Sequence, residues 1–201
     1  MVTNPPFSLF REYVAQLVGY GKKFLIIGNM NAITYKEIFP LIKDGKLWPG
    51  FGTDSWYRVP DDFDDRSGVK IENGKKYFKV KSRWFTNLDV KKRHEKLVLT
   101  EKYYPAKYPK YDNYDAINVS KVTDIPKDYN GVMGVPITFL DKYNPEQFEI
   151  VGTTENGLCD KALWIHPEEK HNEPFIDGKK KYTRILIRRK PVGENAETPA
   201  A

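Results

Sequence analysis

The sequence predicts an α/β fold in its first part, followed by a mixed α+β region. Two patterns carry this prediction: apolar residues at helical spacing on both sides of a short apolar run, and alternating residues around an Asn-Gly pair. The 201 residues are 40% hydrophobic and 30% charged, which suits an ordinary globular core and excludes a disordered or fibrous chain.

A helix, a buried strand and a second helix are expected near the start of the chain. Residues 8–18 (SLFREYVAQLV) repeat apolar side chains at helical spacing, and Gly19 and Gly21 favour the end of that helix. Residues 24–28 (FLIIG) are short and wholly apolar, which is typical of a strand buried on both faces of a helix-covered parallel sheet. In residues 34–43 (TYKEIFPLIK), a capping box predicts a helix that a proline ends or kinks early.

The middle of the chain predicts a loop, a hairpin and a solvated segment. Residues 47–65 carry aromatic side chains among Gly, Pro and Asp, which favours a loop-rich stretch. Asn73 and Gly74 stand between alternating segments and predict the turn of a β-hairpin. Residues 91–115 are dense in Lys and Tyr, and the favoured interpretation is a solvated amphipathic strand with a loop.

The last hundred residues predict short extended segments with prolines between them. These prolines are Pro126, Pro136, Pro145 and Pro174. The final stretch, residues 192–201 (VGENAETPAA), predicts a disordered tail.

The composition limits the compartment and the metal chemistry. No apolar run approaches the roughly 18 residues of a membrane span, and the first residues lack the blocks of a signal peptide. The single cysteine, Cys159, allows no internal disulfide and fits the reducing cytoplasm. Because His94, His166 and His171 lack ligand spacing with Cys159 or with one another, we expect surface histidines and no metal site. The net charge of +6 permits a polyanionic partner without demonstrating one.

Residues 4–7 carry the clearest chemical signal. An Asn followed by Pro-Pro and an aromatic suits methyl transfer to an amino nitrogen on a base, whose lone pair is delocalised into the ring. The Asn4 side-chain oxygen and the Pro5 carbonyl can accept the two amino hydrogens and aim the lone pair at a methyl donor. Pro5 and Pro6 fix the backbone, and Phe7 can stack on a base flipped out of the duplex. As a bare pattern, the same residues fit a turn before a helix equally well.

The chain resembles the EcoRI-type adenine-specific DNA methyltransferases. The resemblance rests on TNPPFSLFREY, FLIIGNMNAITYKEIFPLIKDGKLWPG, SRWFTNLDVKKRHE and YDAINVSKVTDIPKDYNGVMGVPITFLDKYNPEQFEIVG, and it returns at RILIRRK. It implies a Rossmann-like class I methyltransferase that uses S-adenosylmethionine to modify the 6-amino group of adenine in double-stranded DNA, within a restriction-modification system. By this resemblance Asn4, Pro5, Pro6 and Phe7 match the catalytic motif.

The resemblance also divides the chain. Residues 1–100 match the C-terminal part of a catalytic domain, and residues 101–191 match a target-recognition or accessory region. A complete family member has a strand, a glycine-rich loop and an acidic residue for the cofactor before the motif, whereas only residues 1–3 precede it here. We therefore expect a partial Rossmann-like sheet without its cofactor-binding half, and weak or absent S-adenosylmethionine binding. The main cofactor site is expected upstream of Met1, in a missing N-terminal half or a partner chain.

The family places a second aromatic for the flipped base near Trp84 and Phe85. Alternation puts Trp84 on one face of the strand with Phe78, and Phe85 on the other face with Lys79 and Lys81. We therefore expect Trp84 in the core and Phe85 stacked on the base from a basic, wetter face. Simple packing of Phe85 is the alternative.

Two basic clusters are candidates for contacts with DNA phosphates, with a solvated face as the alternative of about equal weight. The clusters are Lys91, Lys92 and Arg93, and the run Lys179, Lys180 and Lys181 with Arg184, Arg188 and Arg189.

Three functions stay open at this point. The first is an adenine-specific DNA methyltransferase, in a truncated form, and the second is a DNA-binding remnant without catalysis. The third is an amino-methyltransferase that acts on cytosine, because the same motif chemistry serves either exocyclic amine. The family resemblance favours adenine.

Overall fold

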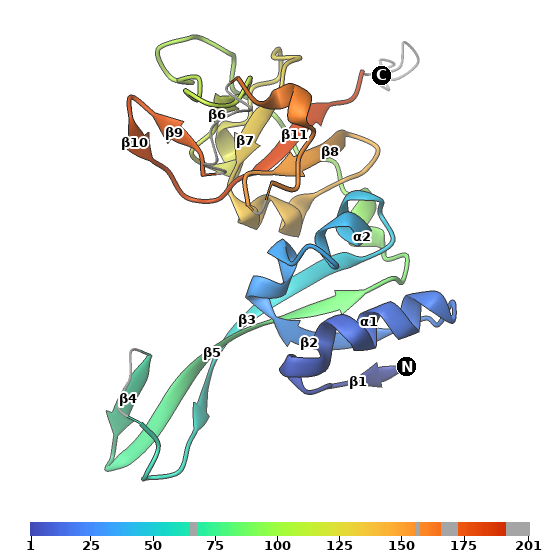
Figure 1. The fold of residues 1–201 in the computed structure, drawn as a ribbon, viewed down its shortest axis with the longest axis vertical. Helices are drawn as coiled ribbons and strands as arrows, with labels where there is room; N and C mark the ends of the chain where they lie inside the picture. The colour runs from blue at the N-terminus through green and yellow to red at the C-terminus, as the bar shows by residue number, and fades with distance from the viewer. Residues whose placement is uncertain (65–67, 156, 166–172, 192–201) are drawn as a thin grey trace, which may run out of the picture.

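The computed structural model of the protein describes residues 1–64, 68–155, 157–165 and 173–191, and its strands form two main sheets (Figure 1). The first sheet, in the lower half of Figure 1, comes from residues 2–86, and the second, in the upper half, from residues 117–189. The predicted tail at residues 192–201 lies outside the described residues, as do His166 and His171.

The first sheet begins with a parallel β–α–β unit. Strand β1 (Val2–Thr3) pairs in parallel with β2 (Leu25–Asn29). Between them the chain forms the 3-10 turn η1 (Phe7–Leu9) and helix α1 (Phe10–Gly19). The first predicted helix is therefore confirmed, because its apolar periodicity matches the face that it buries. The first predicted strand is present, but only alternate residues of β2 are buried and one of its two neighbours is antiparallel, so the expected burial on both faces of a parallel sheet is wrong.

Strand β5 (Lys75–Thr86) is the central element of the remaining sheet. It runs antiparallel to β2 on one side and to β3 (Trp48–Arg58) on the other, in the order β1-β2-β5-β3. Strand β4 (Val69–Glu72) pairs only with the first residues of β5. The turn between β4 and β5 has positive φ at both Asn73 (51°) and Gly74 (70°), which a type I′ hairpin turn requires, so the predicted hairpin is confirmed.

Strand β3 corrects the prediction of a loop-rich stretch at residues 47–65. Eleven of these residues form one strand along β5. A register shift between Pro49 and Gly52 absorbs the two residue types that disfavour a regular ladder. Pairing with the long strand β5 makes this stretch a strand, and the local composition does not reveal that partner.

The second predicted helix is much shorter than residues 34–43. The 3-10 turn η2 (Met30–Thr34) follows β2, and α2 (Phe39–Lys43) begins only after a further turn. Its N-cap is Ile38 without a side-chain cap, so the expected capping box at Thr34 does not start the helix. Pro40 lies in the first turn, where the missing N–H costs nothing, and therefore it opens the helix instead of ending it.

The second sheet is mixed and built from short strands. Its order is β6-β7-β11-β8, with one parallel pair (β6 and β7) and antiparallel pairs elsewhere. The strands are β6 (Ile117–Asn118), β7 (Met133–Val135), β8 (Phe148–Thr153) and β11 (Ile185–Arg189), beside the ribbon β9 (Phe175–Ile176) and β10 (Lys179–Lys180). The remaining turns are η3 (Lys91–His94), η4 (Val122–Asp124), η5 (Ile137–Lys142) and η6 (Lys161–Leu163).

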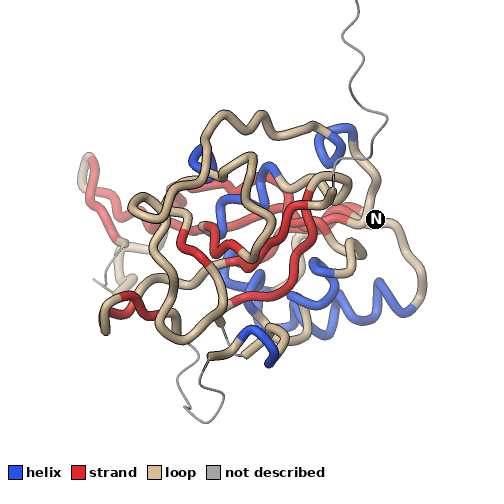
Figure 2. The backbone as a smooth tube through the Cα atoms, turned by 90° about the horizontal axis from the view of Figure 1, so that it is seen from above, coloured by secondary structure: helices blue, strands red, loops and turns tan. Residues whose placement is uncertain are grey.

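One hydrophobic core runs through both sheets. Ile185 and Ile187 of β11 belong to the same cluster as Phe10 and Phe85 of the first sheet. Leu186, on the opposite face of β11, belongs to a smaller second core. Figure 2 shows the longest helical run on one side of the strands, with shorter helical segments on the other side as well. The fold is thus a mixed α/β structure, and the predicted functional division at residue 100 does not separate two cores.

The tyrosines of residues 91–115 correct the prediction of a solvated segment. Tyr108, Tyr111 and Tyr114 are each at most 2% exposed. The Tyr111 hydroxyl donates to Oδ1 of Asn118 (2.8 Å), and burial raises the pKa of the Tyr111 phenol well above its ordinary value. The intervening lysines stay at the surface, which is why a lysine-rich composition concealed a row of core residues.

Candidate active site and nucleic-acid interface

The loop of residues 4–7 lies where β1 ends, at the carboxyl edge of the parallel pair β1 and β2. Thr3 is in register with Ile26, and η1 begins at Phe7, so the loop is held between a strand and a helical segment. In open α/β sheets, ligands bind outside the carboxyl ends of the strands. The predicted catalytic residues therefore stand at the edge where α/β enzymes place their sites.

The loop presents an unpartnered amide on a rigid backbone. Asn4 is exposed, and hydrogen bonds within the described residues leave its side chain without a partner. Pro5 is buried and anchors the loop. The Pro6 carbonyl accepts from the Leu9 N–H (3.0 Å) and is thus committed to the η1 turn. The Asn4 oxygen is consequently free to accept a hydrogen from a ligand.

Close packing of α1 on β2 fixes the position of this loop. Phe7 is half-buried, whereas Phe10 is fully buried and packs its ring 4.9 Å from the ring of Phe85. A Cβ atom at Gly28 would lie 2.4 Å from the Phe10 ring, so only glycine lets the helix approach this near. The motif is therefore supported by a tightly packed aromatic pair directly behind it.

The expected exposure of Phe85 is wrong. Its side chain is 0% exposed and lies under Phe10, while Trp84, expected in the core, is only half-buried. Helix α1 packs on the end of β5 that contains Phe85, through Phe10. Lys79 lies on the same face of β5, but α1 does not reach that part of the strand. The alternation of the sequence correctly separates the two faces of β5, but it does not reveal which face is buried. Phe85 has no accessible ring on which a base can stack.

A cleft of about 390 Å³ opens between the first sheet and the second. This volume lies in the range of about 300–1,000 Å³ that is common for ligand sites. The residues that line it come from the segment after β2, from β5, from η5 and from the loops that flank β8 and β11. They are Met30, Asn31, Thr34, Arg83, Ile137, Thr138, Glu155 and Thr183.

A buried arginine forms one wall of the cleft. Arg83 is 4% exposed, pairs with Asp141 of η5, and donates to the Gly50 carbonyl (2.9 Å). On the other wall, the Thr183 hydroxyl donates to Oε2 of Glu155 (2.6 Å). Sequence reasoning missed Arg83 as a residue of this cleft, since nothing in the alternation of β5 distinguishes a buried arginine from an exposed one.

The first basic cluster lies on η3, and one of its members has a structural partner. Lys91 is exposed and Lys92 is half-buried, whereas Arg93 donates to the Gly45 carbonyl at the end of α2 (3.0 Å). A cation at the C-terminus of a helix satisfies its last carbonyls. Arg93 therefore joins η3 to α2, in addition to its expected place in a phosphate-binding cluster.

The second basic cluster is divided between two strands: Lys179 and Lys180 form β10, whereas the arginines lie at the start of β11 or on it. Nε of Arg184 donates to Oδ1 of Asn118 (3.3 Å) at one end of the strand. At the other end, Arg188 lies 3.7 Å from the Glu149 carboxylate and Arg189 is half-buried. Their expected contacts with phosphates stay predictions.

The end of β11 and η3 meet at one short segment, residues 144–147. The Lys190 N–H donates to the Gln147 carbonyl (3.0 Å), and the Gln147 side chain exchanges hydrogen bonds of 2.7 and 2.8 Å with the backbone of Leu97. The structure therefore brings η3 and the end of β11 into contact with the same segment, which their separation in the sequence does not suggest.

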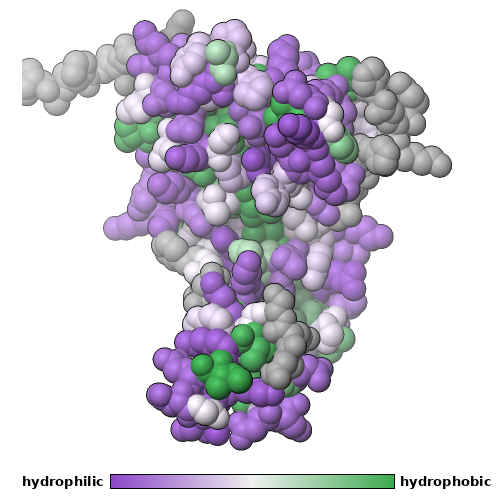
Figure 3. Space-filling view, turned by 90° about the vertical axis from the view of Figure 1, so that its left-hand side faces the viewer, coloured by the Kyte–Doolittle hydropathy of each residue, from purple (hydrophilic) through white to green (hydrophobic). Residues whose placement is uncertain are grey.

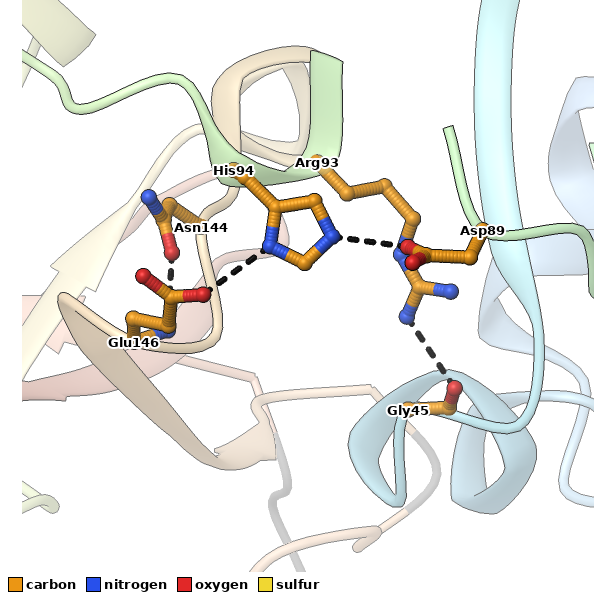
Figure 4. A network of polar contacts seen from close by, with 6 residues as sticks. All are labelled: Gly45, Asp89, Arg93, His94, Asn144 and Glu146. Atoms are coloured by element: carbon orange, nitrogen blue, oxygen red, sulfur yellow. Dashed lines mark hydrogen bonds and ion pairs between the residues drawn. The ribbon is translucent and has the colours of Figure 1, made fainter. Parts of the chain in front are cut away.

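His94 bridges two carboxylates at the junction of the sheets (Figure 4). Its Nε2 lies 2.7 Å from Oδ1 of Asp89, and its Nδ1 lies 2.9 Å from Oε1 of Glu146. These two hydrogen bonds, the one to Asp89 first, raise the pKa of His94, and the bond from His94 lowers the pKa of Asp89. His94 is thus a surface histidine with a structural role between the segments that join the sheets.

The loop between β1 and α1 lacks the glycine pattern of a nucleotide-type cofactor site. It is Asn-Pro-Pro-Phe, without the glycines that let a backbone approach a cofactor. Two later glycines face the protein itself: a Cβ at Gly131 would meet the Tyr129 ring at 2.6 Å, and one at Gly134 would meet the Tyr111 hydroxyl at 2.5 Å. Neither glycine can therefore cradle a ligand.

Metal and membrane signals give no further site. Among the described His, Cys, Asp and Glu side chains, no group of three or more is arranged to hold a metal ion. Within the same residues, no helix is long and apolar enough to cross a bilayer.

Comparison with known proteins places these features in a family. The family described as adenine-specific methyltransferase EcoRI matches residues 1–190. The chain is 52% identical over 198 residues to the type II methyltransferase M.EcoRI of Escherichia coli, a match that covers 94% of this chain and 57% of that protein. It is 37% identical over 206 residues to the type II methyltransferases M.MgeORF184P of Mycoplasma genitalium (96% and 65%) and M.MpnI of Mycoplasma pneumoniae (94% and 64%). The chain thus spans 57–65% of the length of these curated relatives. No solved structure matches it.

Proposed function

Because the chain belongs to the adenine-specific methyltransferase EcoRI family, we propose that it binds and orients the target adenine of a site-specific DNA methyltransferase. The observation that carries this proposal is the exposed, unpartnered Asn4 amide at the carboxyl edge of β1. The relatives are named type II methyltransferases, so we place the reaction in a restriction-modification system.

Asn4 and Pro5 act on the amino group of the flipped adenine. The amino lone pair is delocalised into the ring, so this nitrogen is a weak nucleophile while it stays planar. Acceptance of its two hydrogens by the Asn4 oxygen and the Pro5 carbonyl favours a tetrahedral nitrogen and leaves its lone pair available for the methyl group. The Pro6 carbonyl is already bonded to Leu9, which supports Pro5 as the second acceptor.

Phe7 is the one aromatic of the loop that can contact the base. It is half-buried, in contrast to Phe10 and Phe85, which are closed against each other. Stacking on an aromatic ring compensates an extruded base for the stacking that it loses in the duplex. We therefore assign base stacking to Phe7 and leave Phe85 as the packed support behind it.

The first sheet is proposed to be one part of a Rossmann-like sheet. Its β1–α1–β2 unit has the parallel pairing and the helix-covered face of such folds, and β1 has one strand neighbour among the described residues. S-adenosylmethionine, the methyl donor general in this family, supplies the methyl group. The loop between β1 and α1 has no glycines that could cradle it, so the contribution proposed for this chain is the target half of the reaction.

The test is methyl transfer from labelled S-adenosylmethionine to duplex DNA. The chain is assayed alone and together with the part of the Escherichia coli relative that the match does not cover. Asn4→Ala is expected to lower the rate by at least about 100-fold, with DNA binding unchanged, as for loss of one positioned acceptor. Ser8→Ala, at an exposed position of the adjoining turn, is the matched control. Full activity of Asn4→Ala would contradict the assigned role.

The product identifies the base. Nucleoside mass analysis is expected to give N6-methyladenine, whereas N4-methylcytosine would support the cytosine alternative. A DNA-binding unit without catalysis is the second candidate, which the lack of glycines in the loop between β1 and α1 favours. Calorimetry with S-adenosylmethionine separates the two: tight binding by the chain alone would contradict the missing donor site.

A further inference from the structure

A narrow arm of antiparallel strands projects from the first sheet (Figure 1). We define the arm as residues 56–58 of β3, strand β4 and residues 75–81 of β5. Strand β2 pairs with β5 only from Ser82 to Thr86, so the arm begins at the edge of the sheet that also carries the loop of residues 4–7. Seven residues of β5 at about 3.4 Å each extend about 24 Å beyond that edge.

The arm lies outside the hydrophobic cores of the molecule. Neither hydrophobic core contains a described residue of the arm. Three strands with few buried side chains are marginal on their own, and here they are attached to a long continuous strand. Such a projection from a packed scaffold is a typical place for a binding function.

Cross-strand register sorts the arm into two unlike faces. Directly opposed residues of an antiparallel pair share a face. Trp56 lies opposite Lys79, Arg58 and Lys70 both lie opposite Tyr77, and Glu72 lies opposite Lys75. We call this the cationic face, and its members are Trp56, Arg58, Lys70, Lys75, Tyr77 and Lys79, with Glu72 as its one described acid.

The other face is apolar and partly covered by the arm itself. Phe78 lies opposite Tyr57 and Val69, and the Phe63 ring packs 5.5 Å from the Phe78 ring. Ile71, 67% exposed, is on this face as well. Figure 3, viewed from the left-hand side of Figure 1, shows one hydrophobic patch near the lower end of the molecule with hydrophilic residues around it.

The cationic face combines basic and aromatic side chains in one layer. Nζ of Lys70 lies 4.7 Å from the centre of the Trp56 ring and 5.6 Å from that of Tyr77, and it also pairs with Oε2 of Glu72 (2.9 Å). Trp56 stays 43% exposed. Lysine and arginine side chains presented in this way bind phosphates, and the aromatic rings hold them in place.

The cationic face is on the side of β5 that faces the cleft. Lys79 has the same parity as Arg83, whose guanidinium forms a wall of the cleft and pairs with Asp141 of η5. The arm is long enough to span a major groove of about 12 Å.

We propose that the cationic face of the arm binds the sugar-phosphate backbone of duplex DNA beside the target base. The inference rests on the proposed methyltransferase function and adds a DNA contact far from the two basic clusters expected from the sequence. Lysine and arginine contacts to phosphates position the duplex without reading its sequence. The arm therefore raises affinity and fixes orientation, and it leaves base recognition to other residues.

The test compares two triple variants of the 201-residue chain that have equal net charge. The arm variant carries Arg58→Gln, Lys75→Gln and Lys79→Gln, and the control carries Lys22→Gln, Lys36→Gln and Lys43→Gln, all at exposed positions outside the arm and the site. Lys79 is half-buried, so thermal unfolding of both variants is measured first.

Binding of a fluorescent duplex is then measured by anisotropy at several salt concentrations. The arm variant is expected to raise Kd about tenfold or more and to lower the slope of log affinity against log salt by about 2 to 3. The control is expected to stay within about twofold of the unmodified chain, since its lysines lie away from the duplex.

A second measurement does not depend on the variants. Acetylation of the unmodified chain is followed by mass spectrometry with and without duplex, and Lys75 is expected to be protected while Lys22 and Lys36 are not. Equal affinity of the two triple variants, or no protection of Lys75, would overturn the arm as a DNA contact and leave the proposed function standing. If the unmodified chain binds no duplex at all, both proposals fail. Tighter binding of single-stranded than of duplex DNA would overturn the arm proposal alone.

Discussion

The inner and outer parts of β5 belong to one strand but have opposite surroundings. In residues 82–86, every side chain except that of Trp84 is buried, whereas in residues 75–81 none is. The alternation of the sequence runs through both parts without a break. Burial instead changes where α1 and η5 cease to cover the strand. The comparison teaches that the character of a strand face is set by what packs on it, and can change along a single strand.

The largest effect is expected from removing an aromatic ring in each part of β5. Phe85→Ala should lower the free energy of unfolding by about 3 to 5 kcal/mol, because a fully buried ring in contact with Phe10 is lost. Tyr77→Ala in the arm should cost about 1 kcal/mol or less, since it lies outside both cores. Urea unfolding of the two variants measures the difference. Similar losses would show that the arm is part of the cooperative core.

The two parts also differ in their ion pairs. Asp141→Ala leaves the Arg83 guanidinium buried without its carboxylate, and a loss of about 2 to 3 kcal/mol is expected, reduced because Asp141 itself is 33% exposed. Glu72→Ala removes the exposed partner of Lys70 in the arm and should cost less than about 1 kcal/mol. Denaturant midpoints of both variants provide the measurement. An Asp141 variant as stable as the Glu72 variant would contradict the buried role of Arg83.

Two glycines differ in the room that the structure leaves for a side chain: Gly28 lies inside the first sheet, and Gly19 lies at the end of α1. Gly28→Ala places a methyl group 2.4 Å from the Phe10 ring, and we expect a loss of about 1 to 3 kcal/mol from overpacking. Gly19→Ala, at the end of α1, meets nothing within 4 Å and serves as the matched control, with little change. Thermal unfolding compares the two. A neutral Gly28 variant would mean that α1 shifts without cost, and the loop of residues 4–7 would then be less rigid than its packing implies.

The smallest effect is expected from the exposed network around His94. Its pKa is raised above the ordinary 6.5, so its stabilising contribution is present below that value and is lost as the pH rises through the raised pKa. The lowered pKa of Asp89 has the opposite sign: that contribution is present above 3.8 and lost as the pH falls through the lowered pKa. The contributions of His94 and Asp89 are therefore both present between pH 3.8 and pH 6.5.

Unfolding at pH 5.5 and pH 8.5 tests this network. The unmodified chain should lose slightly more stability than His94→Gln between the two values, because the glutamine does not titrate. His166 and His171 are present in both proteins, so their contributions cancel. An identical pH dependence of the two proteins would remove His94 from any role in joining the segments around Asp89 and Glu146.

Local features were predictable wherever a residue's own geometry decides the outcome. The Asn73-Gly74 turn follows from the ease with which both residues adopt positive φ, and the α1 and β2 periodicities follow from the face that each element buries. The short α2 helix was harder, because Pro40 is compatible with a helix start as well as a helix end. Which of the two occurs at Pro40 depends on how the preceding residues fold.

The sequence by itself determined the Asn4 loop, its family and the elements on either side of it. These depend on residue types within a few positions of one another, whose dihedral limits and hydrogen-bonding groups act locally. Tertiary structure alone decided that Phe85 is buried and Trp84 is not, and that Arg83 lines a cleft. It also decided that Tyr108, Tyr111 and Tyr114 belong to the hydrophobic cores. Burial depends on contacts between segments that are distant in the sequence, and no local pattern shows which segment will pack on a given face.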